Sequence, residues 1–229
     1  MFGGLHIEMA AFKTIGSLLD SSGWTGALVQ ANVATPGTAK SFLWVTHVTH
    51  TRRAHQITAG SLYHLLQKAY LAYCSSLGEE HNQSPLADWC SSRAELYPQF
   101  KFWLLILQLK LAVLVYVRAK REGDFKMYVD ALTKIAPWFF ALNHTNYARW
   151  IPVHVRDIVT LKVVHPKVFA EFLKGNFVVK KTAHRFSFYC HWPRPLAEQC
   201  CSERWRRGSR PLWEPCCFEA LDGFGAGDG

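Results

Sequence analysis

The histidines and cysteines are the residues whose chemistry can be tested most directly from spacing. The chain has 11 His and 7 Cys. His47, His50 and His55 do not form the His-Glu-x-x-His pattern that places two imidazoles and a general base on one helix face. The adjacent pairs Cys200-Cys201 and Cys216-Cys217 lack the two-residue gap of zinc ribbons. The sequence therefore predicts no metal site and no cofactor.

The carboxylates offer little for acid–base or two-metal catalysis. His6 and Glu8 are two residues apart, which places them on different faces of a helix. Glu8 and Asp157 come nearest to a catalytic pair, but a two-metal mechanism needs several converging carboxylates. Neither a Gly-rich phosphate loop nor a Ser or Cys nucleophile signature occurs. We therefore predict no catalytic residues and keep a metal-dependent nuclease or transposase as the third hypothesis for the function.

Basic residues are in excess, and the excess belongs to the first 186 residues. That part holds 21 of the 26 Lys and Arg residues but 11 of the 17 Asp and Glu residues. Such a charge favours phosphate backbones, acidic proteins or anionic lipid heads, and a solvated surface without a ligand is the alternative. Arg52, Arg53 and the cluster at 180–185 are expected to be the best exposed. The candidate nucleic-acid-binding residues are Arg52, Arg53, Arg149, Arg156, Lys180, Lys181 and Arg185.

Residues 144–157, HTNYARWIPVHVRD, combine aromatic and basic side chains. On a helix, Tyr147, Trp150 and His154 follow at three- and four-residue steps and share one face. One interpretation is a surface that contacts a phosphate chain. The other is an aromatic stripe that faces the core, with arginines that extend to solvent.

Apolar residues at helical spacing predict a mainly α fold, a single irregular helical bundle. Asp124 is a natural N-cap, directly after a helix that ends at Gly123, and Pro36 and Gly37 are expected to end a helix. Residues 75–84 are polar and are expected to form a loop. Strand signals are confined to residues 1–4 and 176–180. The predicted helices span residues 5–19, 24–32, 52–74, 98–121, 125–142, 146–164 and 165–175.

The most apolar segment, residues 102–117, contains only Gln108 and Lys110 as polar residues. It is shorter than the ~20 residues of a spanning helix, and Lys110 would cost roughly 2.5–3.5 kcal/mol near the bilayer centre. We therefore expect a buried core helix and no membrane partner. Cys74 and Cys90 are the only cysteines before residue 187, and the sequence does not begin with a basic segment followed by an apolar one. We expect an intracellular protein, nuclear or cytoplasmic.

The composition changes near Phe186. Five of the 7 Cys lie in the last forty residues, mixed with Trp, Arg, Pro and Gly, and no apolar period continues there. This change predicts one helical domain over residues 1–186. It also predicts a disordered tail over residues 187–229 that does not dock on the domain.

Three stretches of the chain resemble blocks of an uncharacterised animal protein family that is abundant in cnidarian and fish genomes. They read MFGGLHIEMA, REGDFKMYVDALTKIAPWFFALNHTNYARWIPVHVRD and EFLKGNFVVKKT. The similarity spans residues 1–187. The family is associated with transposable elements and with a ribonuclease-H-like transposase core, so the resemblance implies descent from a transposase.

The same resemblance implies a truncated and frameshifted member of that family. Longer members place a segment with an acidic strand before the block that matches residues 1–10, and they often have Asp at the position of Asn143. Loss of that strand would abolish chemistry that depends on Asp and Glu from separate strands. Back-translation of the tail, read one base later, gives a sequence close to the one that follows in the family. We therefore expect a frameshift near Ser187.

These observations lead to two hypotheses from different classes. The first is a catalytically inactive fragment of a transposon-derived protein that binds nucleic acid weakly and in a salt-sensitive manner. The alternative is a helical module that binds an unidentified protein, with an affinity that salt leaves nearly unchanged.

Overall fold

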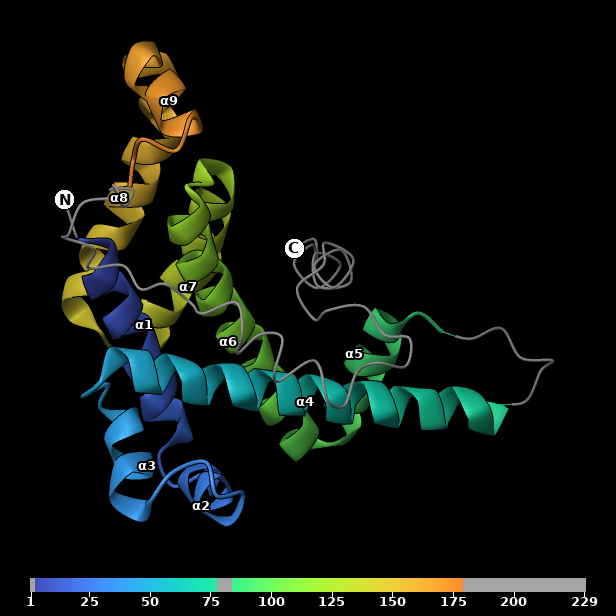
Figure 1. The fold of residues 1–229 in the computed structure, drawn as a ribbon. Coiled ribbons are helices and arrows are strands. Elements are labelled where there is room, and N and C mark those ends of the chain that lie inside the picture. Colours follow the sequence, from blue (N-terminus) through green and yellow to red (C-terminus); the bar gives the residue numbers. More distant parts are fainter. Residues whose placement is uncertain (1–2, 78–83, 179–229) are drawn as a thin grey trace.

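The computed structural model describes residues 3–77 and 84–178, and all regular structure within these ranges is helical (Figure 1). The predicted mainly α fold is therefore confirmed. The strand signals are wrong in the described ranges, because Gly4 begins a helix and residues 176–178 form a turn. The tail predicted over residues 187–229 lies outside the described residues. The helices are α1 (Gly4–Leu19), α2 (Trp24–Gln30), α3 (Pro36–Leu43), α4 (Val48–Leu77), α5 (Leu86–Leu96), α6 (Pro98–Glu122), α7 (Phe125–Ala141), α8 (Thr145–Val164) and α9 (Pro166–Leu173).

The boundary between α6 and α7 follows the prediction. Gly123 takes the left-handed conformation, φ 74°, that commonly ends a helix. The Asp124 carboxylate then accepts a hydrogen bond of 2.9 Å from the backbone N–H of Met127. This bond satisfies one of the free N–H groups at the start of α7.

Two helices were not predicted. Pro36 was expected to end a helix, but it begins α3, because proline is well suited to the first helical position, where its missing N–H is not needed. The second missed helix, α5, occupies residues without a clear apolar period. Only Trp89 and Cys90 of α5 are buried.

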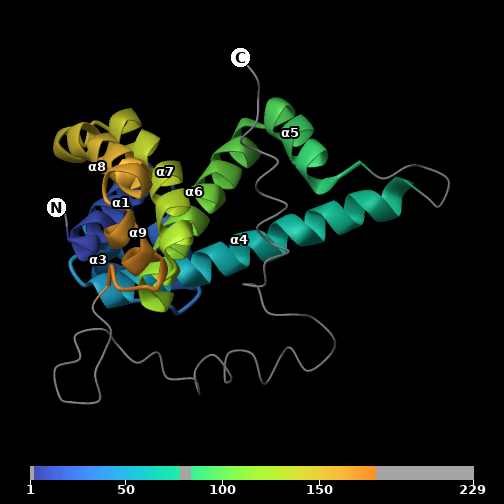
Figure 2. The ribbon, with the colours of Figure 1, turned by 90° about the horizontal axis from the view of Figure 1, so that it is seen from above.

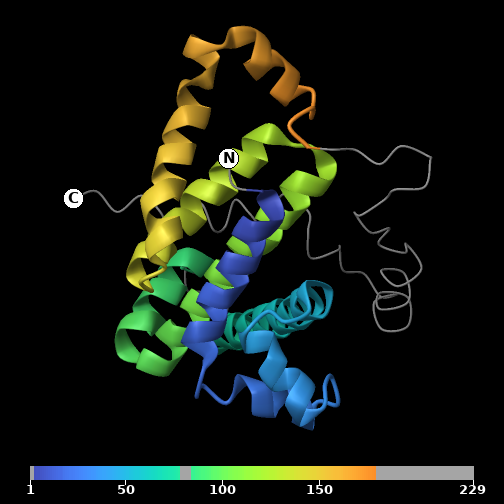
Figure 3. The same cartoon turned by 90° about the vertical axis from the view of Figure 1, so that its left-hand side faces the viewer.

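The centre of the molecule is α6, which packs against α1, α4, α5 and α7. Figure 3 shows α1 along the middle of the molecule, with α7 and α8 on one side and α3 and α4 on the other. By length and composition α6 is the one helix of the described ranges that could cross a membrane. In the structure its buried residues face other helices. The core includes Phe12, Ile15, Leu19, Ile106, Leu107, Val113, Tyr116, Leu132, Ile135, Phe139 and Ile151.

The second half of α4 forms an arm with α5 and the start of α6. Figure 2 shows α4 leaving the body, while α5 and the first turns of α6 lead back toward it. No residue of α4 from 61 to 76 is buried. Aromatic side chains hold the arm together, since Trp89 contacts Tyr70, Tyr73 and Phe100 at ring-centroid distances of 5.4–5.9 Å.

A close approach of α1 and α3 fixes the corner where α3 meets α4. A Cβ atom added to Gly16 would lie 2.2 Å from the carbonyl oxygen of Leu43. No real Cβ contact is that short, so any larger residue would push the last turn of α3 away from α1. The glycine therefore sets the position of the turn that follows Leu43.

Candidate nucleic-acid interface

The turn between α3 and α4 places a tryptophan on the surface. Trp44 is 63% exposed, whereas the next residue, Val45, is buried. Val45 has φ 58°, in the left-handed region that β-branched residues rarely adopt. Such a conformation persists only where the surroundings enforce it. Burial of the Val45 side chain thus keeps the turn in a conformation that leaves Trp44 exposed.

Five exposed basic side chains accompany Trp44. They come from α1, from α3, and from the turn and first residues of α4. Lys40 lies on the last turns of α3, His47 in the turn itself, and His50 and Arg53 on the first turns of α4. We call this set the Trp44 surface: Lys13, Lys40, Trp44, His47, His50 and Arg53.

Two contacts join members of the Trp44 surface in pairs. Nζ of Lys13, on α1, lies 6.0 Å from the ring centroid of Trp44. The imidazole rings of His47 and His50 are also 6.0 Å apart. His144, in the turn between α7 and α8, is close enough to Lys13 to interact with its charge. Burial is the main cause of the lowered pKa of His144, and the positive charge of Lys13 is the second cause.

The segment that contributes most of this surface has no acidic residue. Residues 21–78 contain no Asp or Glu, although they hold Lys40, Arg52, Arg53 and Lys68. The positive potential of the corner is therefore not offset by carboxylates from α2, α3 or α4. Arg52 and Arg53 of this segment were predicted to bind nucleic acid, but Lys40 and Trp44 were not. The long gap between acidic residues is the signal that would have identified them.

A buried ion-pair cluster anchors the start of α4 to α1 and α6. Oε1 of Glu8 accepts two hydrogen bonds from Arg52, one of them from Nε at 2.9 Å, and Oε2 accepts one of 3.0 Å from Lys120 Nζ. Lys120 Nζ also donates to the carbonyl oxygen of Gly4 at 2.8 Å. The Glu8 side chain is only 2% exposed. Burial lowers the pKa of Lys120, and the Glu8 carboxylate opposes that shift.

This cluster corrects one predicted binding residue. Arg52 was expected to be among the best exposed, but its guanidinium is largely buried and bound to Glu8. A carboxylate that accepts both hydrogen bonds leaves Arg52 poorly placed for a phosphate. Its role is to hold α4 in place, next to the exposed Arg53.

One layer further along α4 and α6, a lysine and a histidine share a hydrogen bond in the core. Lys110 Nζ lies 2.6 Å from His55 Nδ1, and both residues are fully buried. The His55 ring is stacked between Phe12 and Trp24, at centroid distances of 4.8 and 5.0 Å. Thr58 completes the layer, because its hydroxyl accepts a 2.8 Å bond from the Trp24 indole N–H.

Burial favours the neutral form of both members of this pair. It lowers the pKa of Lys110 well below the ordinary range, and it lowers that of His55, with the charge of Lys110 as the second cause. Nζ of Lys110 also lies 4.5 Å from the Trp24 ring centroid, a position that favours an ammonium ion. That attraction, about 2 kcal/mol when desolvated, is smaller than the cost of burying a charge. The balance therefore shifts toward the amine and away from the ammonium ion.

Lys110→Met is expected to change the pH dependence of stability. Because the folded pKa of Lys110 lies below its unfolded value, the unfolded chain holds the extra proton, and wild-type stability rises as pH increases toward the unfolded pKa. Methionine has no such proton, so the stability of the variant relative to the wild type should fall as pH rises. The lost hydrogen bond to His55 costs about 1–3 kcal/mol at either pH. Urea unfolding of both proteins near pH 7 and near pH 9.5 measures the difference. An equal difference at both pH values would contradict a lowered pKa of Lys110.

The other predicted basic residues are dispersed. Arg53 lies exposed on α4, and Arg149 and Arg156 lie exposed on α8. Arg156 pairs with the neighbouring Asp157 at 2.8 Å, and both side chains are well exposed. The structure therefore brings only Arg53 to the Trp44 surface. Lys180, Lys181 and Arg185 lie outside the described residues.

The aromatic stripe of α8 divides between core and solvent. The Tyr147 ring stacks on Phe139 at 5.3 Å, and His154 Nε2 lies 3.1 Å from the hydroxyl of Tyr128. Trp150, by contrast, is 50% exposed. The core-facing interpretation therefore holds for Tyr147 and His154.

The described residues do not assemble a catalytic centre. The Glu8 carboxylate is paired with Arg52 and Lys120, whereas Asp157 lies exposed on α8. No three His, Cys, Asp or Glu side chains in the described ranges are arranged to hold a metal ion. Burial raises the pKa of the Cys90 thiol to about 11, so it is not a thiolate nucleophile.

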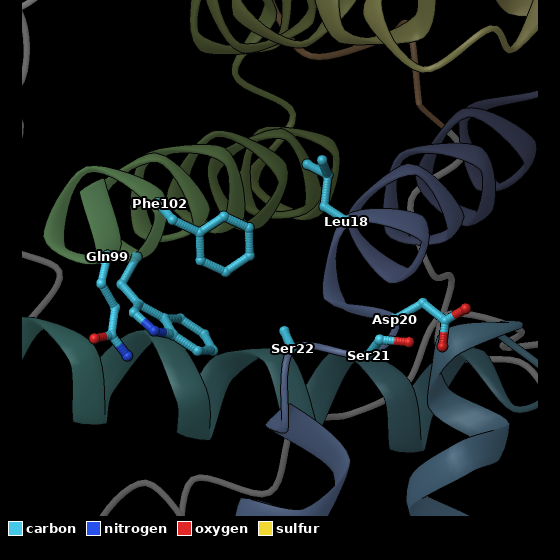
Figure 4. Close-up of a pocket in the computed structure, with 7 residues that line it drawn as sticks. Leu18, Asp20, Ser21, Ser22, Gln99 and Phe102 are labelled. Atoms are coloured by element: carbon cyan, nitrogen blue, oxygen red, sulfur yellow. The ribbon is translucent and has the colours of Figure 1, made fainter.

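A shallow pocket lies between the α1–α2 turn and the first turns of α6 (Figure 4). The ring of Phe102 lies on the α6 side of the pocket, and Ser22 and Asp20 belong to the turn opposite. Trp103 also lines the pocket. Asp20 is the only titratable side chain among the lining residues. The pocket therefore lacks the paired groups that acid–base or nucleophilic catalysis requires.

Comparison with known proteins adds one finding. A family model described as Domain of unknown function (DUF8702) matches residues 80–194. The match includes α5 to α9 and begins after α4, so the Trp44 surface lies outside it. Searches of curated proteins and of solved structures find no match.

Proposed function

We propose that this chain, which belongs to the family of the domain of unknown function DUF8702, binds nucleic acid weakly and without sequence preference through the Trp44 surface. The observation that carries the proposal is the exposed Trp44 with Lys13 Nζ 6.0 Å from its ring, together with the exposed Lys40, His47, His50 and Arg53 from a stretch, residues 21–78, that contains no Asp or Glu. Lys and Arg contacts to phosphates release counterions, which makes such binding strong at low salt and weak at physiological salt.

We further propose that the protein is transposon-derived and has no nuclease activity. Two of the three sequence blocks that resemble the transposon-associated family fall inside the matched residues 80–194. Glu8, which lies in the remaining block, MFGGLHIEMA, is held by Arg52 and Lys120 in a structural ion-pair cluster. A carboxylate whose charge is already paired with two cations is poorly suited to hold a catalytic metal ion.

We propose that the protein is intracellular and does not bind membranes. Lys110 lies near the middle of α6, whose core-facing residues are covered by α1, α4 and α7. Cys74 and Cys90 are free thiols, as expected in a reducing compartment. These features support a water-soluble nucleic-acid-binding role, either in the nucleus or in the cytoplasm.

Binding to duplex DNA of unrelated sequence is expected to weaken steeply with salt. Fluorescence anisotropy with a labelled duplex should give a dissociation constant in roughly the micromolar range at low salt that rises about linearly with salt on a log–log plot. The same duplex should stay intact in Mg²⁺ or Mn²⁺. Affinity that salt leaves unchanged, or cleavage that Asp157→Asn abolishes, would contradict the proposal.

One observation favours the alternative, a protein-binding helical module. The arm exposes Leu65 and Leu71 on α4, and Leu96 and Tyr97 after α5. Apolar side chains on an extended arm suit contact with another protein. Under this alternative, removal of Lys40 and Arg53 would leave the binding of the partner unchanged, and DNA would not bind in a salt-sensitive manner.

A further inference from the structure

We infer that the Trp44 surface is built for single-stranded nucleic acid, with an unpaired base stacked on the Trp44 indole and the flanking phosphates held by Lys40, His50 and Arg53. This inference rests on the proposed function and deepens it. The proposed function requires only positive charge. A single-strand site requires, in addition, an accessible aromatic ring at the middle of that charge.

The exposure of Trp44 is the first argument. At 63% exposed it presents a flat ring to solvent, while the other described tryptophan of this corner, Trp24, is buried. Bases in a duplex are already stacked on each other, so an exposed indole gains little from them. An unpaired base has a free face, and stacking on an aromatic side chain is independent of sequence because every base has one.

The rigidity of the turn is the second argument. Val45 is buried in a left-handed conformation, and its backbone N–H donates to the carbonyl oxygen of Phe42. On the other side of the turn, Gly16 packs directly against the backbone of Leu43. A ring on a rigid turn loses little conformational freedom when a ligand binds, which favours binding.

The placement of charge is the third argument. Lys13 Nζ lies 6.0 Å from the Trp44 ring centroid, and the exposed Lys40, His50 and Arg53 precede and follow Trp44 along the chain. A strand that stacks one base on Trp44 can therefore place phosphates against cations in both directions. Neutral or basic partners lack the negative charge that this arrangement complements, and an acidic protein lacks the base that would stack on Trp44.

A comparison of single and double strands separates stacking from charge. Duplex DNA has the higher charge density, so a purely electrostatic surface binds it more tightly. We expect the reverse here: at one low salt concentration, an oligothymidine should bind more tightly than a duplex of equal length. Anisotropy of labelled oligonucleotides measures both affinities on the intact chain.

Trp44→Ala is expected to weaken oligothymidine binding by about tenfold or more and to change duplex affinity by less than about twofold. Trp44→Phe should retain most of the affinity, because a smaller ring still stacks. Trp150→Ala, at the half-exposed tryptophan of α8, is the matched control and should have no effect. Circular dichroism checks that each variant is folded.

Two outcomes would overturn the inference. If duplex binds more tightly than the single strand, or if Trp44→Ala and wild type bind oligothymidine equally, the surface recognises charge alone, and the proposed function still stands. If wild type binds neither polymer at low salt, both the inference and the proposed function are wrong.

Discussion

Leu107→Asp is expected to unfold the helical body. Leu107 is buried in α6, the helix on which α1, α4, α5 and α7 pack. A carboxylate buried there loses its hydration and costs several kcal/mol. That is a large part of the about 5–15 kcal/mol that stabilises a typical domain. Thermal unfolding followed by circular dichroism should show the loss of the cooperative transition.

The matched control for Leu107→Asp is Leu65→Asp, at an exposed leucine of the α4 arm. A surface change of this kind should alter stability by less than about 0.5 kcal/mol. A folded Leu107→Asp protein, or partition of the wild-type protein into detergent or membrane fractions, would contradict the place of α6 in the core of the helical body.

Glu8→Gln is expected to destabilise the body by about 3–5 kcal/mol. The substitution keeps the size of the side chain but leaves the charges of Arg52 and Lys120 next to each other with no carboxylate between them. Both cations are mostly buried, so water does little to screen them. Urea unfolding of the variant and the wild type measures the loss.

Glu122→Gln is the control for Glu8→Gln, because Glu122 pairs with Arg118 in an exposed ion pair. Such pairs contribute about 0–1 kcal/mol. If the two substitutions cost the same, the Glu8 cluster does not anchor α4, and the Trp44 surface has no fixed base.

Much of the fold was accessible from the sequence because helix signals are local. The apolar period identified the segments that form α1, α4, α6, α7, α8 and α9, and the pair of Gly123 and Asp124 located the boundary between α6 and α7. The helix at Pro36 was missed because proline both ends helices and begins them, and only the residues that follow it distinguish the two cases.

The polar core could not be predicted, because its partners are far apart in the chain. Glu8 meets Arg52 across 44 residues and Lys120 across 112. Lys110 meets His55 across 55 residues. Helical periodicity shows which face of a helix is apolar, but it does not show which charge of another helix lies opposite. For this reason Arg52 was expected at the surface.

The Trp44 surface escaped prediction for a different physical reason. A large apolar side chain such as that of Trp44 is expected to be buried. In the structure Val45, in a left-handed conformation, is buried instead, and Trp44 is exposed. Nothing in the residue types signals that conformation, because β-branched residues rarely adopt it. The absence of acidic residues from 21 to 78 was visible in the sequence and is the more general signal.

The salt dependence of duplex binding, compared between two double variants, tests the central claim most directly. Lys40→Gln with Arg53→Gln removes charge from the Trp44 surface, and Arg149→Gln with Arg156→Gln removes the same charge from α8. If the Trp44 surface binds the phosphates, the first variant should bind more weakly, with a log–log salt slope smaller by about one per residue removed. The second should match the wild type. Equal behaviour of the two variants, or a loss only in the α8 variant, would contradict the account.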